Sequence, residues 1–197
     1  VVIGHGASGI AVVLMLLRHA QSHDIVTHID IAPEIGAGVA YSTPDDTLLL
    51  NVRASNMSVY ADMPTHFATW VQQHHQSDAS AFVPRRWYAQ YLRETLQAAI
   101  AACAGTYDHI HAQVRDIDPQ SRTLVLHDGR RVNGDHIVLA IGHAPIANPL
   151  QRWVPTPARV IAGYDWARIR HTIAPDEPVI IVGTGLTMVD AISALQH

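Results

Sequence analysis

Lysine is absent from this sequence: all thirteen basic residues are arginine. Its absence excludes a Walker-type phosphate loop, a Schiff-base enzyme and a pyridoxal enzyme within this chain, because each needs a lysine amine. Cysteine is nearly absent, with Cys103 the single example. One cysteine excludes both an internal disulfide framework and a dithiol redox centre.

Excess positive charge and long apolar runs are also missing. The net charge of -4 argues against a nucleic-acid partner held by bulk electrostatics. The apolar run over residues 10–17 is too short to span a bilayer, which needs about 20 residues, and no basic segment precedes it. We therefore expect no membrane partner and a cytoplasmic location. The fourteen histidines lack the spacing of a zinc site, so we expect no bound metal.

What is present is enough apolar sequence for a folded core. The chain has 197 residues, 48 % of them hydrophobic, which suits one domain, or one domain and part of a second. It has no initiator methionine and ends within an apolar segment that predicts a helix. We expect it to be part of a longer polypeptide.

The first thirty residues predict a strand, a glycine-rich turn, a helix and a second strand. Residues 1–3 are the end of an apolar strand, residues 4–9 (GHGASG) the turn, and residues 7–20 an apolar helix. The β-branched residues 24–31 predict the next strand. This order is a βαβ unit and therefore predicts an α/β fold with a parallel sheet.

The turn fits the pattern G-x-G-x-x-G, in which each glycine has a purpose. Gly4 permits the tight turn, Gly6 lets a pyrophosphate approach the backbone, and Gly9 lets the helix pack closely on the strand. The phosphates then face the N–H groups at the helix start, from Gly6 through Ala7 and Ser8 to Gly9. The pattern alone is weak, but its place between a strand and a helix supports a dinucleotide site.

Asp30 supplies the acid that such a site needs. It lies about 20 residues beyond Gly9, at the end of the second strand, where a carboxylate holds a ribose hydroxyl. The alternative is that Asp30 is an ordinary solvated strand end. The strand–turn–helix context favours the dinucleotide interpretation.

The rest of the chain predicts a helical insertion and a β-meander. Residues 32–58 predict a long loop, and two helices start near Pro64 and at Pro84. Cys103 falls on the apolar face of the second helix, as a core thiol would. The strand candidates that follow are residues 109–117, 123–127, 131–132 and the near-continuous apolar run 135–141, a buried parallel strand by composition.

A second strand–glycine turn–helix pattern begins at Pro178, after a linker containing Pro145, Pro149, Pro155 and Pro157. Its turn runs from Gly183 through Gly185, Leu186 and Thr187 to Met188, which replaces the third glycine. The alternatives are a second dinucleotide site and a purely structural turn. Two such sites in one chain suggest FAD together with NAD(P)H.

Six segments together carry a family resemblance that covers nearly the whole chain. The sequence resembles the bacterial FAD/NAD(P)-binding proteins of the YdhS-like type, relatives of flavin-containing and N-hydroxylating monooxygenases. The segments are GHGASG, PEIGAGVAYST, LLLNVRASNMS, FVPRRWYAQYL, VLAIGHAP and GTGLTMVD. Asp30 departs from the pattern, since glutamate is commoner there.

The resemblance implies roles for the candidate residues. The first turn and Asp30 would bind the ADP moiety of FAD, Val114 would offer backbone groups to adenine, and Gly142 would pass near the flavin. The second turn would bind the NAD(P) pyrophosphate. Other polar residues have two alternatives, a cofactor or substrate contact and an ordinary surface role; they are Tyr41, Asn51, Arg53, Arg85, Arg86 and His143.

The expected domains are an FAD-binding domain over residues 1–160, with the helical insertion at about 60–104, and a linker followed by the start of an NAD(P)-binding domain over 161–197. The expected fold is Rossmann-like. The expected function is an NAD(P)H-using, FAD-dependent oxidoreductase resembling a monooxygenase. A flavin reductase without oxygen insertion and a non-catalytic nucleotide sensor are the alternatives. The substrate, a small molecule, is not identified by the sequence, and no catalytic residue is assigned.

Overall fold

A four-stranded parallel sheet forms the centre of the fold. The computed structural model describes residues 1–32, 35–143, 160–161 and 165–196. The strands lie in the order β3-β2-β1-β7 and every neighbouring pair is parallel. Their bounds are β1 Val2–Ile3, β2 Ile25–Asp30, β3 Thr106–His111 and β7 Val138–Leu139. The structure thus confirms the α/β class and the parallel βαβ unit.

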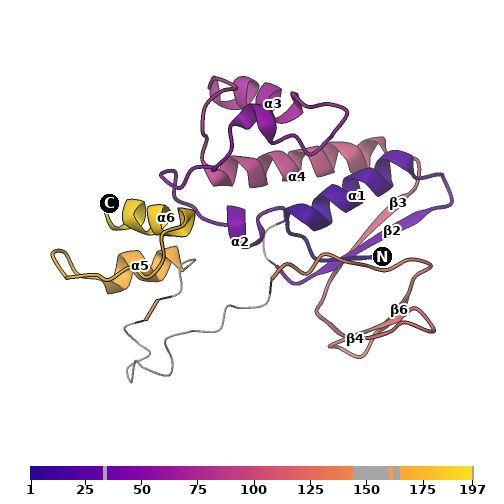
Figure 1. Cartoon of the computed structure of the whole chain (residues 1–197). Coiled ribbons are helices and arrows are strands. Elements are labelled where there is room, and N and C mark those ends of the chain that lie inside the picture. The colour runs from indigo at the N-terminus through magenta and orange to yellow at the C-terminus, as the bar shows by residue number, and fades with distance from the viewer. Residues whose placement is uncertain (33–34, 144–159, 162–164, 197) are drawn as a thin grey trace.

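Helices cover one face of this sheet (Figure 1). Helix α1 (Ala7–His19) lies directly on it, α4 (Arg85–Ala102) packs against α1, and α3 (His66–His75) lies outermost. Buried Val2 and Val26 from the sheet join the aromatic side chains of α3 and α4 in one core cluster. The helices expected near Pro64 and at Pro84 are confirmed. The loop between the sheet and α3 also contains short helices, α2 (Gly38–Tyr41) and η1 (Ala54–Asn56).

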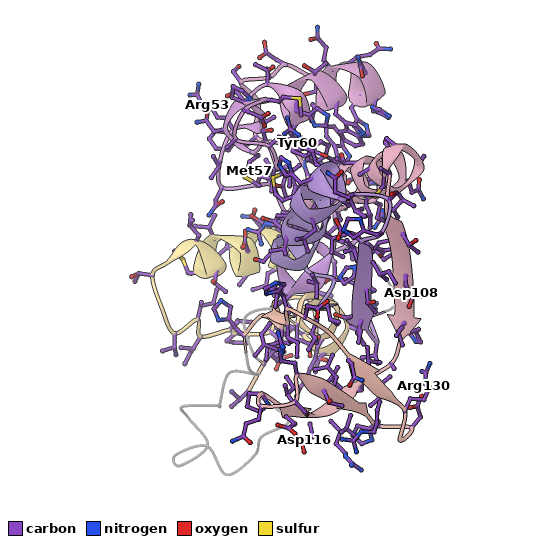
Figure 2. All side chains as sticks on the ribbon, turned by 90° about the vertical axis from the view of Figure 1, so that its right-hand side faces the viewer. Arg53, Met57, Tyr60, Asp108, Asp116 and Arg130 are labelled. Carbon is purple, nitrogen blue, oxygen red and sulfur yellow. The ribbon has the colours of Figure 1, made fainter. Side chains whose placement is uncertain are left out.

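A small antiparallel sheet covers the opposite face. It consists of β4 (Val114–Asp118), β5 (Thr123–Leu126) and β6 (Arg131–Asn133), in that order. Leu124 and Leu126 pack against Ile3 and Ile29 of the parallel sheet. Figure 2 shows the resulting layers, with Asp116 of β4 and Arg130 of the turn before β6 at one end, and Arg53 and Tyr60 of the segment before α3 at the other.

The strand expected over residues 109–117 is two strands in two different sheets. The chain changes partner at Ala112 and Gln113: the Ala112 N–H donates to the Asp30 carbonyl, and the Gln113 carbonyl accepts from His127. Residues 106–111 therefore extend the parallel sheet as β3, and residues 114–118 begin the meander. A pattern of apolar residues cannot show with which strand each residue forms its backbone hydrogen bonds.

Part of the run 135–141 forms a parallel strand beside β1, but the expectation that the run is buried was wrong. Only Val138 and Leu139 are in the strand, and Leu139 and Ile141 are 57 % and 69 % exposed. The reason is that β7 lies at an edge of the described sheet, with β1 as its one bonded neighbour among the described residues.

The second motif forms its helix without its strand. Helix α6 (Leu186–Leu195) begins at the glycine turn, and α5 (Trp166–Thr172) precedes it. The expected strand from Pro178 is not formed: within the described residues no strand lies beside it to share hydrogen bonds, and Ile180 and Val182 are 90 % and 74 % exposed. The proline-containing linker lies largely outside the described residues.

The two C-terminal helices are attached to the rest of the fold by a small apolar cluster. Fully buried Leu48, from the loop before α3, packs with Ile169 of α5 and with Ala191 and Ala194 of α6. None of the helices in the described part of the chain combines the length and apolar character needed to cross a membrane.

Candidate functional site

The first glycine turn contains two glycines that the fold requires. Gly4 has φ +110°, and a Cβ built there would lie 2.3 Å from the carbonyl oxygen of Ala140. A Cβ at Gly9 would lie 1.8 Å from the carbonyl oxygen of Gly4. These contacts allow β1, β7 and α1 to approach closely, so both glycines act in backbone packing.

Gly6 differs, because nothing in the fold requires it. Its φ of -61° and ψ of 174° suit any residue, and among the described residues a Cβ there would meet no atom closer than Gly38 Cα at 4.0 Å. The adjoining Ser8 is exposed. Gly6 therefore presents bare backbone where the described fold would accept a methyl group, and bare backbone is what a diphosphate needs.

The start of α1 offers unpaired donors at the same place. The first bond of the helix runs from the Ile10 N–H to the Gly6 carbonyl. Among the described residues, the N–H groups of Ala7, Ser8 and Gly9 have no hydrogen-bond acceptor. With the positive end of a thirteen-residue helix behind them, they form an arrangement suited to an anion.

Asp30 holds the turn in place. One carboxylate oxygen accepts from the His5 N–H at 2.7 Å and the other from the Ala32 N–H at 2.5 Å. Burial alone would raise the pKa of Asp30, but these backbone hydrogen bonds outweigh it and hold the pKa below its usual value. The carboxylate is therefore ionised at neutral pH. Each oxygen keeps a further lone pair, as a contact with ribose hydroxyls requires.

A cluster of histidines lies beneath the turn, and the sequence patterns did not predict it. Buried His28 of β2 contacts the Gly4 carbonyl through Nε2 at 2.8 Å and the Tyr107 hydroxyl through Nδ1 at 3.1 Å. Because a carbonyl only accepts, Nε2 carries the proton and Nδ1 accepts from Tyr107. Burial lowers the pKa of His28, in keeping with this neutral form.

His5, the residue between the first two glycines, is 1 % exposed and lies beside His28 and His109. Its Nε2 is 3.2 Å from the His109 Nε2, and its Nδ1 has no partner among the described residues. Burial, and then the imidazoles of His28, His109 and His111, lower the pKa of His5 to about 4 despite the opposing attraction of Asp30. No group of three or more histidine, cysteine or acidic side chains in the described ranges is placed to hold a metal ion.

The loop after β2 closes over the turn with backbone only. The Gly36 N–H donates to the His5 carbonyl at 2.8 Å, and a Cβ at Gly38 would lie 3.3 Å from Gly6 Cα. Two glycines thus face each other across the turn. Tyr41, at the end of α2, packs on Tyr88 of α4.

The other two residues predicted for the first site, Val114 and Gly142, follow in the chain the carboxyl ends of β3 and β7 in the parallel sheet. Val114 begins β4, two residues after the Ala112 N–H that donates to the Asp30 carbonyl. Gly142, with φ +70°, follows the Ala140 carbonyl on which Gly4 packs. Both therefore lie a short distance along the chain from residues that contact the turn or Asp30.

The second turn has no close neighbours among the described residues. Neither a Cβ at Gly183 nor one at Gly185 would meet any of their atoms within 4 Å. Gly185 precedes α6, and its carbonyl accepts from the Met188 N–H. The N–H groups of Leu186 and Thr187 have no acceptor in the described part of the chain.

Arg85 and Arg86, at the start of α4, have acidic partners. Arg85 pairs with Asp190 of α6, and Arg86 pairs with Asp46 in an exposed ion pair. Asp46 and Asp190 therefore offset the repulsion between these cations and the positive end of the helix.

A groove of about 630 Å³ lies elsewhere. It is bounded by the C-terminal half of α1, by α3 and by α4, with Leu14, Arg18 and Trp70 among its lining residues. None of the residues of the two glycine turns lines it. The groove is therefore separate from the candidate nucleotide sites.

The parallel sheet, the bare turn and the acid at the end of β2 define a dinucleotide-binding protein with a Rossmann-like fold. Residues 1–144 match the model of the FAD-NAD(P)-binding family, and the chain belongs to that family. Membership supports FAD and NAD(P)H as its cofactors. No curated protein sequence matches the chain.

Two solved structures are similar to parts of this chain. The sulfide:quinone oxidoreductase from Aquifex aeolicus is 18 % identical, with a TM-score of 0.34 over 74 % of this chain and 24 % of that one. The PF1083 protein from Pyrococcus furiosus is 9 % identical, with a TM-score of 0.43 over 72 % of this chain and 58 % of that one. The present chain thus spans less than two thirds of either protein.

Proposed function

We propose that this chain is the nucleotide-binding part of an FAD-dependent NAD(P)H oxidoreductase. In this proposal residues 1–160 hold FAD, and residues 161–197 begin the unit that holds NAD(P)H. The FAD site consists of Gly4, Gly6, Ala7, Ser8, Gly9, Asp30, Val114 and Gly142. The NAD(P)H site begins with Gly183, Gly185, Leu186 and Thr187.

The observation that carries the proposal is the difference between Gly6 and its neighbouring glycines. Gly4 and Gly9 are explained by packing, whereas Gly6 has room for a side chain and lacks one. Beside it lie N–H groups that have no acceptor among the described residues, and the backbone of Gly38 faces it. A ligand with a diphosphate accounts for all three features.

The residues of the chain bind and orient, and the cofactors supply the redox chemistry. FAD and NAD(P)H, when bound, would supply hydride-transfer chemistry. The N–H groups at the start of α1 would neutralise the diphosphate, and the ionised Asp30 would accept from ribose hydroxyls. Gly36 and Gly38 would let the loop close over the diphosphate without a side chain in its way.

Family membership does not distinguish among flavin oxidoreductases, so the finer assignment rests on the sequence resemblance. We propose a monooxygenase-like enzyme of the YdhS-like type, in which reaction with O₂ follows hydride transfer. The one cysteine of the chain, Cys103, caps α4 and packs partly buried against the helical core, away from both turns. With one cysteine, this chain has no cysteine pair to offer a flavin, unlike the disulfide reductases.

Titration of the full-length protein with FAD and with NAD(P)H tests the proposal. We expect FAD to bind, as flavin fluorescence reports, and the visible absorption of the bound flavin to bleach when NADPH or NADH is added without oxygen. Steady substrate-linked oxygen consumption with formation of an oxygenated product then supports the monooxygenase. Turnover with an artificial electron acceptor but no oxygenated product supports the reductase instead. If neither FAD nor NAD(P)H binds, the whole proposal is contradicted.

A further inference from the structure

A largely buried ion pair connects the helix that follows the second glycine turn to the FAD-binding part. The Arg85 guanidinium donates through Nη2 to Asp190 Oδ2 at 2.7 Å and through Nε to the Leu49 carbonyl at 2.9 Å. The side chains of Arg85 and Asp190 are each only 14 % exposed. Figure 1 shows α4 and α6, which carry this pair, meeting beside α2.

The geometry of this contact fixes an orientation, which an exposed pair does not do. Arg85 is held at two points of a planar group, by a carbonyl of the loop before α3 and by a carboxylate of α6. Such an arrangement restrains both distance and rotation. Arg18 is also held at two points, by both carboxylate oxygens of Asp62, but the two side chains are 41 % and 56 % exposed, so water screens their interaction.

Asp190 is well placed to transmit that restraint to the second turn. It lies on α6, whose N-cap is Gly185, so its position sets the direction of the N–H groups at the helix start. Arg85 lies at the start of α4, which packs on α1, the helix of the first turn. The pair therefore joins the two helices on which the two nucleotide sites depend.

We propose that Arg85 is a positioning residue for hydride transfer: by holding Asp190 and the Leu49 carbonyl, it fixes the position of the second glycine turn relative to the first. This inference rests on the proposed function. Hydride transfer needs the two rings in contact, and a misplacement of about 1 Å can slow a reaction about 100-fold. The pair then acts on the rate of reduction and not on the affinity for FAD.

The test measures anaerobic flavin reduction by saturating NADPH or NADH in the full-length, FAD-loaded protein. We expect Arg85→Gln and Asp190→Asn to lower the reduction rate constant about 10-fold or more, with the FAD dissociation constant changed less than about 2-fold. The double variant should be no slower than the slower single one, because both remove one interaction. Arg18→Gln, which breaks an exposed Arg–Asp pair far from both turns, should leave the rate unchanged.

A second double variant tests the inference in case the single variants fail to fold. Arg85→Met with Asp190→Leu removes both charges together, which proteins tolerate better than one unpaired buried charge. We expect this folded double variant to be slow as well. Unchanged reduction in the folded variants, or an equal loss of FAD affinity and rate, would overturn the inference. A wild-type protein that binds no FAD or is not reduced contradicts the proposed function itself, and this is seen before any variant is made.

Discussion

At the scale of single residues, two of the three glycines of the first turn are needed for folding, and the third is a candidate for binding. Gly4 and Gly9 each have a backbone oxygen within 2.3 Å of the place where a Cβ would stand, whereas the nearest atom of the described residues at Gly6 is 4.0 Å away. The sequence pattern treats the three alike. The structure therefore assigns a packing role to the outer two glycines and none to the middle one.

Substitution of Gly6 and Gly9 distinguishes these roles. We expect Gly6→Ala to change the free energy of unfolding by less than about 1 kcal/mol, because its backbone angles and surroundings accept a methyl group. Its FAD dissociation constant should nevertheless rise about 10-fold or more, since the methyl group occupies the diphosphate surface. Gly9→Ala should cost at least about 2 kcal/mol, since its Cβ would overlap the Gly4 carbonyl. Chemical denaturation and FAD titration give the two quantities, and equal FAD affinity in Gly6→Ala and wild type would count against the site.

His5 makes a second residue-scale prediction, on pH. Its folded pKa of about 4 lies below the ordinary value of 6.5, so between these values the folded protein binds fewer protons than the unfolded chain. The free energy of unfolding should therefore fall as pH falls from 6.5 to about 4, by up to about 3 kcal/mol. Asp30, whose folded pKa is lowered, loses its contribution only at still lower pH, as its carboxylate becomes protonated.

The variant His5→Ala removes the titrating imidazole and should flatten this dependence, whatever its effect on absolute stability. Urea denaturation at pH 7, 6, 5 and about 4.5 measures the slope. His23→Ala, at a side chain that is 82 % exposed, serves as the control. An unchanged slope in His5→Ala would show that other groups cause the acid sensitivity.

At the scale of elements, local patterns predicted the helices and the first βαβ unit well. The apolar spacing of α3 and α4 and the glycine turn before α1 each lie within one continuous segment, so their signals are complete in the sequence. The partners of β3 and β7 are not local. The switch of sheet at Ala112 depends on Asp30, and the exposure of Leu139 depends on which strands lie beside it.

The histidine cluster escaped prediction for the same reason. His5, His28 and His109 belong to the turn, β2 and β3, and only the register of the sheet brings them together. In the sequence they are three isolated histidines without metal-site spacing. The positions of Gly4, Gly6, Gly9 and Asp30, in contrast, follow a spacing that the βαβ unit itself imposes, so the sequence could place them together.

One buried hydroxyl connects α4 to α3 and to the loop before it. Tyr91 is fully buried, and its oxygen contacts His66 Nδ1 at 2.7 Å and accepts from the Val59 N–H at 3.3 Å. Tyr91→Phe would leave both groups without this partner, and we expect it to cost about 1–3 kcal/mol of unfolding free energy. Tyr88→Phe is the matched control: Tyr88 is also buried, and its hydroxyl has no hydrogen bond within the described part of the chain. Equal losses in the two variants, measured by thermal or chemical unfolding, would contradict this account.

At the scale of the whole molecule, the two glycine turns belong to parts of unequal size. The first lies in a layered body with helices on one face of a parallel sheet and a meander on the other (Figure 1). The second lies beside exposed apolar residues, and its helix is joined to that body by the Arg85 pair and by the cluster around Leu48. The strength of these two attachments therefore determines how firmly the C-terminal helices are held in position against the rest of the molecule.

Leu48 is the apolar part of that attachment and can be tested by itself. It is fully buried against Ile169, Ala191 and Ala194, so Leu48→Ala removes the buried side chain through which the first body joins this cluster and should cost about 2–5 kcal/mol of local stability in α5 and α6. We expect hydrogen exchange to quicken in α5 and α6 by at least about 10-fold while β2 and α1 exchange as before. The neighbouring Leu49, 41 % exposed, provides the control Leu49→Ala, which should leave the exchange of α6 unchanged. If Leu48→Ala instead quickened exchange equally in α1 and α6, the two parts would unfold together, and the C-terminal helices would be a piece of the first body and not an attached unit.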